Sequence, residues 1–452
     1  MSKISARAPL VALCQAFLLL ACATTLQSHA AGPVPGPAIE HVIRAYVQFH
    51  GITGAAIAVQ RDDDVLYSGT FGHANVELEA PVRDDTLFQL SSTTKLFTGT
   101  LVTSLAQDGL VDLARPLRHY LPQLPETWGD VLVGDALSHV SGVPEVLECE
   151  ESEDRDRALA CVFGMERPMS RRQKFVYNQT NYLLAMMLIE SVTGLPFHGA
   201  LEKYLLMPAG ITGAVIDGNS LHVVPGRATS YYPDDSGGIR IREYDFPWFL
   251  STAAGLNLSL ADMRRFAAAL QDGTLLANEW KARMWQVPEL VDGSLSNYSI
   301  GWDNRKINHG EESLGHNGGN LTTFRTYPVA GLSVTVLTNG LHSHFDMDEL
   351  ADVLAMTVEP DLLLPVDTLA YHVKLAYIDA GLDASLAMLT EGLHADTLGP
   401  DDPVDIVSWF ADELADAGRS SDAALVLRYG TERFPAAAEL RLQLDEIRET
   451  GR

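Results

Sequence analysis

Residues 88–99 read FQLSSTTKLFTG and place Ser92 three positions before Lys95. In a helix that begins near Ser91, this spacing brings both side chains to one face. A serine hydroxyl is a weak nucleophile until a base takes its proton, and a lysine with a lowered pKa can be that base. The same spacing also fits a helix start with Ser91 or Ser92 as N-cap and a solvated Lys95. Other segments have to distinguish the two interpretations.

Two later segments carry further polar candidates. Tyr177-Asn178-Gln179 precedes an apolar helix predicted over Leu183–Val192, and His316-Asn317-Gly318-Gly319 opens two predicted strands, Leu321–Tyr327 and Leu332–Thr338. Each segment has a structural alternative, since Tyr177 fits a buried aromatic, His316 a satisfied polar residue and the glycine pair a hairpin turn. Their joint order after Ser92 and Lys95 favours a functional interpretation.

Together, Ser92-Thr93-Thr94-Lys95, Tyr177-Asn178-Gln179 and His316-Asn317-Gly318 resemble the ordered motifs of the serine beta-lactamase-like hydrolases. That family includes class C beta-lactamases, D-alanyl-D-alanine carboxypeptidases, D-aminopeptidases and beta-lactamase-fold esterases. The resemblance spans about residues 38 to 345. It implies a mixed α/β (α+β) fold of the beta-lactamase/transpeptidase type. A mainly antiparallel sheet of N- and C-terminal strands is flanked by helices, with a helical subdomain between them.

The chemistry that this resemblance implies is acyl transfer. Ser92 would attack a carbonyl, Lys95 would take or relay its proton, and Tyr177 would act as general base, as phenolate or as proton relay. An ordinary tyrosine pKa of about 10 has to fall for the phenolate role, and Lys95 supplies a cause. The backbone N–H groups of Ser92 and Gly319 would form the oxyanion hole.

Substrate contacts are expected from Gln179, His316, Asn317 and Gly318, and two of these depart from the family pattern. Gln179 stands where the family usually has asparagine, and His316 where penicillin-hydrolysing members usually have lysine. A histidine with a pKa near 6.5 holds a carboxylate less firmly than lysine, which favours an esterase, amidase or peptidase. For an anionic substrate we therefore expect the Michaelis constant to rise between about pH 6 and 8.

The N-terminus has the features of an export signal. Lys3 and Arg7 precede the apolar run Leu10–Leu20, and Ser28-His29-Ala30 offers a cleavage site, which predicts a signal peptide over residues 1–30 and a periplasmic or secreted protein. An alternative is a lipobox at Leu19–Cys22, with Cys22 lipidated as a membrane anchor. After the predicted signal peptide, we expect a linker over 31–37, a hydrolase domain over 38–358 and an α-helical extension over 359–452.

Two cysteines remain after the predicted signal. Cys149 and Cys161 bracket an acidic segment, and an oxidising compartment permits a disulfide between them. Two unpaired buried thiols are the alternative. A bridge would stabilise so short a loop by about 3 kcal/mol on the chain-entropy model.

Composition limits the remaining partners. A net charge of −27 disfavours nucleic acid and anionic membranes, and the scattered histidines and few cysteines give no metal-ligand spacing, so neither a metal nor a cofactor is predicted. From about Asp361 the chain resembles one or two degenerate tetratricopeptide-type repeats. We expect these helices to dock on the hydrolase domain, with a protein partner as an open option.

The sequence thus predicts an exported serine hydrolase that acts through an acyl-enzyme on Ser92. The substrate would be a small-molecule ester, amide or peptide, such as a D-amino-acid peptide, a beta-lactam or a small ester. The alternative is a catalytically silent protein that binds peptidoglycan fragments or serves as a scaffold. The joint presence of Ser92, Lys95 and Tyr177 disfavours that alternative.

Overall fold

The computed structural model describes residues 36–149, 154–234, 238–342, 345–393 and 398–450. The predicted signal peptide, the Cys22 lipidation site and most of the predicted linker lie outside these residues. Within the described part of the chain, no single helix is long and apolar enough to cross a membrane. One bent helix pair, Thr180–Thr193 with Phe197–Leu206, has the length and the apolar composition of a span when the two helices are taken together.

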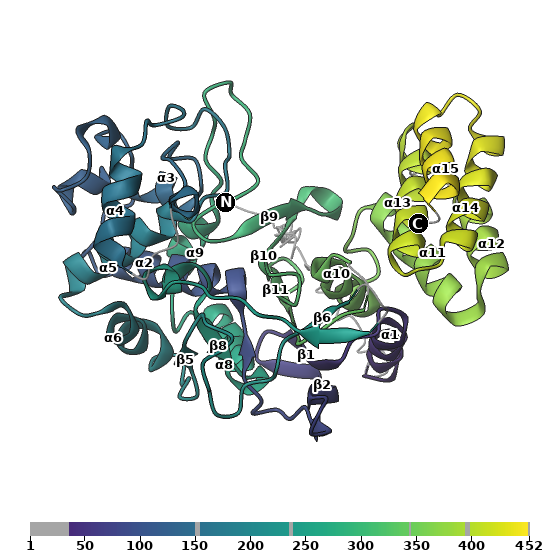
Figure 1. Ribbon diagram of the computed structural model, residues 1–452, viewed down its shortest axis with the longest axis horizontal. Helices are drawn as coiled ribbons and strands as arrows, with labels where there is room; N and C mark the ends of the chain where they lie inside the picture. Colours follow the sequence, from purple (N-terminus) through teal and green to yellow (C-terminus); the bar gives the residue numbers. More distant parts are fainter. Residues whose placement is uncertain (1–35, 150–153, 235–237, 343–344, 394–397, 451–452) are drawn as a thin grey trace, which may run out of the picture. The chain divides into compact units, whose positions relative to one another are not determined.

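A seven-stranded sheet joins the two ends of the hydrolase region, in the order β3-β2-β1-β12-β11-β10-β9. Every neighbouring pair is antiparallel. Its strands are β1 (Gly54–Arg61), β2 (Asp64–Asn75), β3 (Ala80–Pro81), β9 (Asp303–Lys306), β10 (Glu312–Gly318), β11 (Thr322–Tyr327) and β12 (Leu332–Thr338). The predicted antiparallel sheet of N- and C-terminal strands is therefore confirmed (Figure 1).

Helices cover both faces of this sheet, which explains why its central strands β1, β11 and β12 are buried at nearly every position. Side chains alternate across a strand, so Ala55, Ile57 and Val59 of β1 face one core and Ala56 and Ala58 face the other. The first core is closed by α1 (Gly36–Phe49) and α10 (Met347–Val358), and the second by α2 (Thr94–Gln107) and α8 (Leu260–Gln271).

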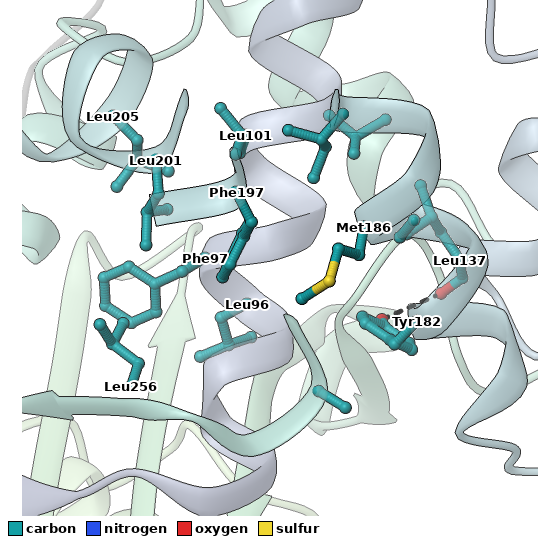
Figure 2. Close-up of a cluster of buried hydrophobic side chains, with 14 of the residues drawn as sticks. Leu96, Phe97, Leu101, Leu137, Tyr182, Met186, Phe197, Leu201, Leu205 and Leu256 are labelled. Atoms are coloured by element: carbon teal, nitrogen blue, oxygen red, sulfur yellow. Dashed lines mark hydrogen bonds between the residues drawn. The ribbon is translucent and has the colours of Figure 1, made fainter. Parts of the chain in front are cut away.

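Helix α2 lies in the middle of the second core and carries the candidate lysine near its start. All of its residues from Thr94 to Ala106 are buried. Figure 2 shows Leu96, Phe97 and Leu101 of α2 in a cluster with Met186 and Phe197. A helix packed on all sides has a fixed depth and rotation, so a side chain that it carries is fixed as well.

The helical block between the two groups of strands completes the hydrolase region. Its helices are α3 (Val133–Leu137), α4 (Arg155–Gly164), α5 (Thr180–Thr193), α6 (Phe197–Leu201), α7 (Ser251–Ala254) and α9 (Asn278–Trp285). Five short strands accompany them: β4 (Phe88–Gln89), β5 (Val215–Ile216), β6 (Tyr231–Pro233), β7 (Ile239–Ile241) and β8 (Leu256–Leu258). The predicted disulfide between Cys149 and Cys161 is present and joins the start of this block to α4.

The C-terminal segment is helical, as predicted. It consists of α11 (Pro365–Ala380), α12 (Leu382–Gly392), α13 (Asp402–Asp416), α14 (Ser420–Arg433) and α15 (Ala438–Thr450), which share a core of their own. Its relation to tetratricopeptide repeats stays a prediction. Lys374 of α11 forms a buried ion pair with Glu349 of α10, at 2.7 Å.

Candidate active site

Ser92 and Lys95 lie together, but on two different kinds of helix. Ser92 is in a 3-10 turn, Ser91–Thr93, and α2 begins only at Thr94. The Lys95 Nζ atom lies 3.4 Å from the Ser92 Oγ atom and 3.0 Å from the carbonyl oxygen of Ala253. Ser91 adopts a φ of 47°, in the left-handed region that non-glycine residues rarely occupy. Such local strain occurs often at functional sites.

Buried threonines fix this turn against the sheet. The Thr93 hydroxyl donates to the carbonyl oxygen of His316 at 3.1 Å and lies 3.1 Å from the Thr322 hydroxyl. Thr322 in turn donates to the carbonyl oxygen of Leu90 at 2.9 Å. Residues on both sides of Ser92 are therefore tied to β10 and β11, which holds the hydroxyl beside the strand edge.

The surroundings of Lys95 let much of its amine be neutral near neutral pH, as a general base requires. Its side chain is fully buried, and burial lowers its pKa to about 7 although the carboxylate of Glu145 acts in the opposite direction. The Nζ atom lies 4.8 Å from the ring centroid of Tyr177 and 5.0 Å from that of Tyr182. The Tyr182 hydroxyl donates to the Leu137 carbonyl oxygen at 3.3 Å, which fixes that ring (Figure 2).

Tyr177 is also in the site, but the predicted fall of its pKa is wrong. Its hydroxyl is hydrogen-bonded to Ser92 and to Gln179, and both bonds lower the pKa. Burial of the hydroxyl outweighs them, so the pKa is raised above its usual value of 10, and water at the exposed part of the ring moderates this rise. Tyr177 is therefore a neutral phenol that can relay a proton, and Lys95 is the better base.

His316 faces the site, yet it cannot act as the charged anchor that the sequence suggests. Burial and the nearby Lys95 lower its pKa to about 3. Its Nδ1 atom lies 2.6 Å from the Asn317 carbonyl oxygen, and its buried Nε2 has no hydrogen-bond partner in the described structure. Between pH 6 and 8 the ring therefore stays neutral, and it cannot cause the rise in the Michaelis constant that the sequence predicts.

Asn317 lies on the wrong face for a substrate contact. Successive side chains of β10 alternate, and the Asn317 amide points to the side of α10, where Nδ2 donates to Asp346 at 3.2 Å and Oδ1 accepts from the Asn320 N–H at 3.0 Å. Asn317 therefore shapes the turn after β10. The sequence motif could not separate this structural role from a catalytic one.

Gln179 contacts Tyr177, and its Oε1 atom is buried without a hydrogen-bond partner in the described structure. Its backbone N–H donates to the Glu145 Oε2 atom at 2.8 Å. Glu145 is a site residue that the sequence analysis missed. It lies in the connecting segment between α3 and α4, outside the three motifs.

The glycine pair allows the strand edge to approach the nucleophile closely. A Cβ atom on Gly318 would lie 1.9 Å from the Leu90 carbonyl oxygen, so only glycine fits there. Gly319 has a φ of 57°, and a Cβ atom on it would lie 3.2 Å from the Ser91 Oγ atom. The Gly319 peptide thus borders the turn that contains Ser92, as its predicted oxyanion role requires.

These features define a class of site: a serine hydroxyl, a buried lysine amine and a tyrosine hydroxyl lie together at the edge of an antiparallel sheet. Comparison with known proteins agrees. The Beta-lactamase family model matches residues 39–359. The chain belongs to the beta-lactamase family, whose members are generally serine hydrolases.

Three known proteins are similar to this chain in sequence or in fold. A penicillin-binding protein of Bacillus subtilis strain 168 is 22% identical over 60% of this chain and 63% of its own length. The chain thus matches less than two thirds of that relative. Two solved structures have a similar fold: EstCE1, a hydrolase with promiscuous acyltransferase activity (TM-score 0.60, 16% identity, 73% of this chain and 98% of that one), and a D-stereospecific amidohydrolase from Streptomyces sp. (TM-score 0.56, 21%, 72% and 97%).

Proposed function

We propose that this protein is an exported serine hydrolase that cleaves an ester or amide through an acyl-enzyme on Ser92. The substrate class includes D-amino-acid peptides, beta-lactams and small esters. The similar proteins include a penicillin-binding protein, a hydrolase with promiscuous acyltransferase activity and a D-stereospecific amidohydrolase, which supports this range. The penicillin-binding relative and the predicted export signal support a location outside the cytoplasm.

One observation carries the proposal: the buried Lys95 amine lies 3.4 Å from the Ser92 hydroxyl with a pKa of about 7. A catalytic base works best when its pKa is near the working pH. Hydrogen bonds of this kind often shorten only when substrate is bound. A lysine with a merely structural role would need neither this depth nor this contact.

The proposed reaction has two halves. Neutral Lys95 takes the Ser92 proton as Oγ bonds to the substrate carbonyl, and the oxyanion is held by the N–H groups of Ser92 and Gly319. The carbonyl–heteroatom bond then breaks, and the leaving group receives a proton through Tyr177. In the second half, water gives a proton to the same pair as its oxygen bonds to the acyl carbon. The bond between the Ser92 Oγ and the acyl group then breaks, the proton returns to Oγ, and the acid is released.

The test is covalent labelling of the mature protein with a fluorophosphonate, with the adduct located by mass spectrometry. We expect one adduct on Ser92, lost in Ser92→Ala. Ser104→Ala makes the same change at a buried serine of the following helix, α2, and should keep the adduct.

The alternative, a silent protein that binds peptidoglycan fragments, predicts a different result. Ser92 would then carry no adduct, and Ser92→Ala would match the wild type on a panel of esters and D-amino-acid peptides. That pair of results would refute the proposed hydrolase.

A further inference from the structure

His139, in the segment between α3 and α4, contacts the chain on both sides of Tyr177. Its carbonyl oxygen accepts the Val176 N–H at 2.9 Å, and its Nδ1 atom accepts the Asn178 N–H at 3.1 Å. Its ring packs on the Tyr177 ring, with centroids 4.3 Å apart and planes inclined by 33°. One residue outside the three motifs therefore holds both the backbone and the ring of Tyr177.

The hydrogen bonds of His139 define the state of its ring. The side chain is buried, and burial together with the nearby Lys95 lowers its pKa well below the usual value of 6.5, so the ring is neutral. Because Nδ1 accepts the Asn178 N–H, the ring hydrogen is on Nε2. Nε2 has no hydrogen-bond partner among the described residues. The ring therefore acts on Tyr177 through Nδ1 and through its flat face.

His139 is itself held in place. It adopts a φ of 56°, in the left-handed region where Asn, Asp and His are enriched among non-glycine residues. Its N–H donates to the Ala136 carbonyl oxygen at 3.0 Å. The Asn181 amide nitrogen lies 3.2 Å from Nδ1, and the Asn181 side-chain oxygen accepts the Ser141 hydroxyl at 2.7 Å. The turn after α3 is thus joined to α5, and Tyr177 lies in the segment that leads into α5.

Tyr177 needs such support because its position decides a proton transfer. In the proposed reaction, Lys95 passes the Ser92 proton to Tyr177 as the phenol gives its own proton to the leaving group. The Tyr177 hydroxyl is hydrogen-bonded to Ser92. Tyr177 is 38% exposed, and the exposed part of the ring has no protein packed on it. Its alignment therefore depends on the contacts of its buried part, among them those with His139.

We propose that His139 is a positioning residue that keeps the Tyr177 hydroxyl in place between Ser92 and the leaving group. When the carbonyl–oxygen bond of an ester breaks, its electron pair stays on the leaving oxygen. A strongly basic alkoxide needs the Tyr177 proton at that moment, whereas a weakly basic nitrophenolate leaves without it. This inference rests on the proposed hydrolase function and extends it to the step that releases the leaving group.

The experiment compares two esters of nearly equal shape, 4-nitrobenzyl butanoate and 4-nitrophenyl butanoate. The first releases a strongly basic alkoxide, and the second releases a weakly basic phenolate. The measured quantity is the ratio of kcat/KM for the benzyl ester over the phenyl ester. Both esters meet the same protein molecules, so the ratio does not depend on the fraction of the protein that is folded.

Two variants separate the contacts of His139. His139→Phe keeps a ring beside Tyr177 but removes the Nδ1 acceptor. We expect the ratio to fall at least about tenfold, because general acid catalysis typically contributes about 10²–10⁴ in rate. His139→Asn keeps an acceptor and tolerates the left-handed backbone but loses the ring, so the fall should be smaller. In a Tyr177→Phe background, which lacks the phenol proton, His139→Phe should lower the ratio no further.

The matched control is His50→Phe. His50 is equally buried, but it follows α1 and its ring stacks on Phe345, with centroids 3.8 Å apart. This change should leave the ratio as it is in the wild type.

An unchanged ratio in both His139 variants, or in the one that folds, would overturn the inference, and so would an equal fall in His50→Phe. A wild-type protein that is labelled on Ser92 but does not cleave the benzyl ester would overturn it as well, since Tyr177 would then protonate no alkoxide. If the wild-type protein cleaves neither ester and Ser92 takes no fluorophosphonate, the proposed hydrolase function itself has failed.

Discussion

The pKa of Lys95 is lowered because the effect of burial is larger than the opposing effect of a nearby carboxylate. Burial favours the neutral amine, and the Glu145 carboxylate favours the charged ammonium. Glu145 is held in place by two backbone N–H groups, those of Leu147 at 3.1 Å and Gln179 at 2.8 Å. The working pH of the site therefore depends on a residue outside all three motifs.

This balance predicts the pH dependence of catalysis. Lys95 accepts a proton only when neutral, so kcat/KM for a neutral ester should rise as the pH passes about 7. Glu145→Gln removes the effect that raises the Lys95 pKa, so the acidic limb of the profile should move to lower pH. The amide keeps one of the two oxygens that accept the backbone N–H groups of Leu147 and Gln179. A limb that stays in place or moves to higher pH would contradict this account.

The sequence predicted which residues form the site better than it predicted their protonation states. Sequence order located Ser92, Lys95 and Tyr177, and the structure brings all three together. The raised pKa of Tyr177 and the neutrality of His316 depend on how much protein surrounds each ring, which a motif does not encode. Glu145 was missed because it comes from a connecting segment with no motif.

At the scale of elements, the site depends on the contact between the 3-10 turn Ser91–Thr93 and the strands β10 and β11. The buried hydroxyls of Thr93 and Thr322 form the hydrogen bonds of this contact. The strands themselves were predictable from their apolar runs and turn residues. The 3-10 turn was not, because a serine-rich helix start gives the same sequence signal as a regular α-helical one.

Replacing the Thr93 hydroxyl should therefore weaken both stability and catalysis. Thr93→Val keeps the volume but leaves the His316 carbonyl oxygen without this donor, so the free energy of unfolding should fall by about 1–3 kcal/mol. We also expect kcat to fall, because Ser92 loses its fixed distance from the oxyanion donors. Denaturant unfolding and steady-state kinetics measure the two effects.

The control for this variant is Thr103→Val in α2. Its hydroxyl is equally buried but donates to the Gly99 carbonyl oxygen within the same helix, at 2.8 Å. It should lose less stability and keep its kcat. If both variants show the same loss of kcat, the contact between the 3-10 turn and the strands β10 and β11 has no special role in positioning Ser92.

At the scale of the whole molecule, one buried cation connects the hydrolase region with the C-terminal helices. Lys374 of α11 is fully buried and pairs with Glu349 of α10 and Glu413 of α13. Its Nζ atom also lies 5.0 Å from the ring centroid of Tyr46 in α1 and 5.6 Å from that of Trp409 in α13. Four helices thus share one charged group.

Lys374→Met should destabilise the protein strongly, since two buried carboxylates lose their cation. Breaking a buried pair in this way typically costs about 3–5 kcal/mol. Lys281→Met is the matched control, because Lys281 is a buried lysine that donates only to the backbone carbonyl oxygens of Leu270 and Gln271, at 3.0 Å each. It should cost less.

The pH dependence of the stability lost in Lys374→Met tests whether that loss is electrostatic. Burial raises the pKa of Glu413 to about 7, above its unfolded value of 4.5, so its contribution to stability is full below about pH 4.5 and is lost as the pH rises through 7. Lys374 opposes this rise, and its removal should raise the Glu413 pKa further. Unfolding measurements should therefore show a larger deficit for Lys374→Met at pH 8 than at pH 5. An equal deficit at both values would mean that lost packing of the lysine stem, and not uncompensated charge, accounts for the destabilisation.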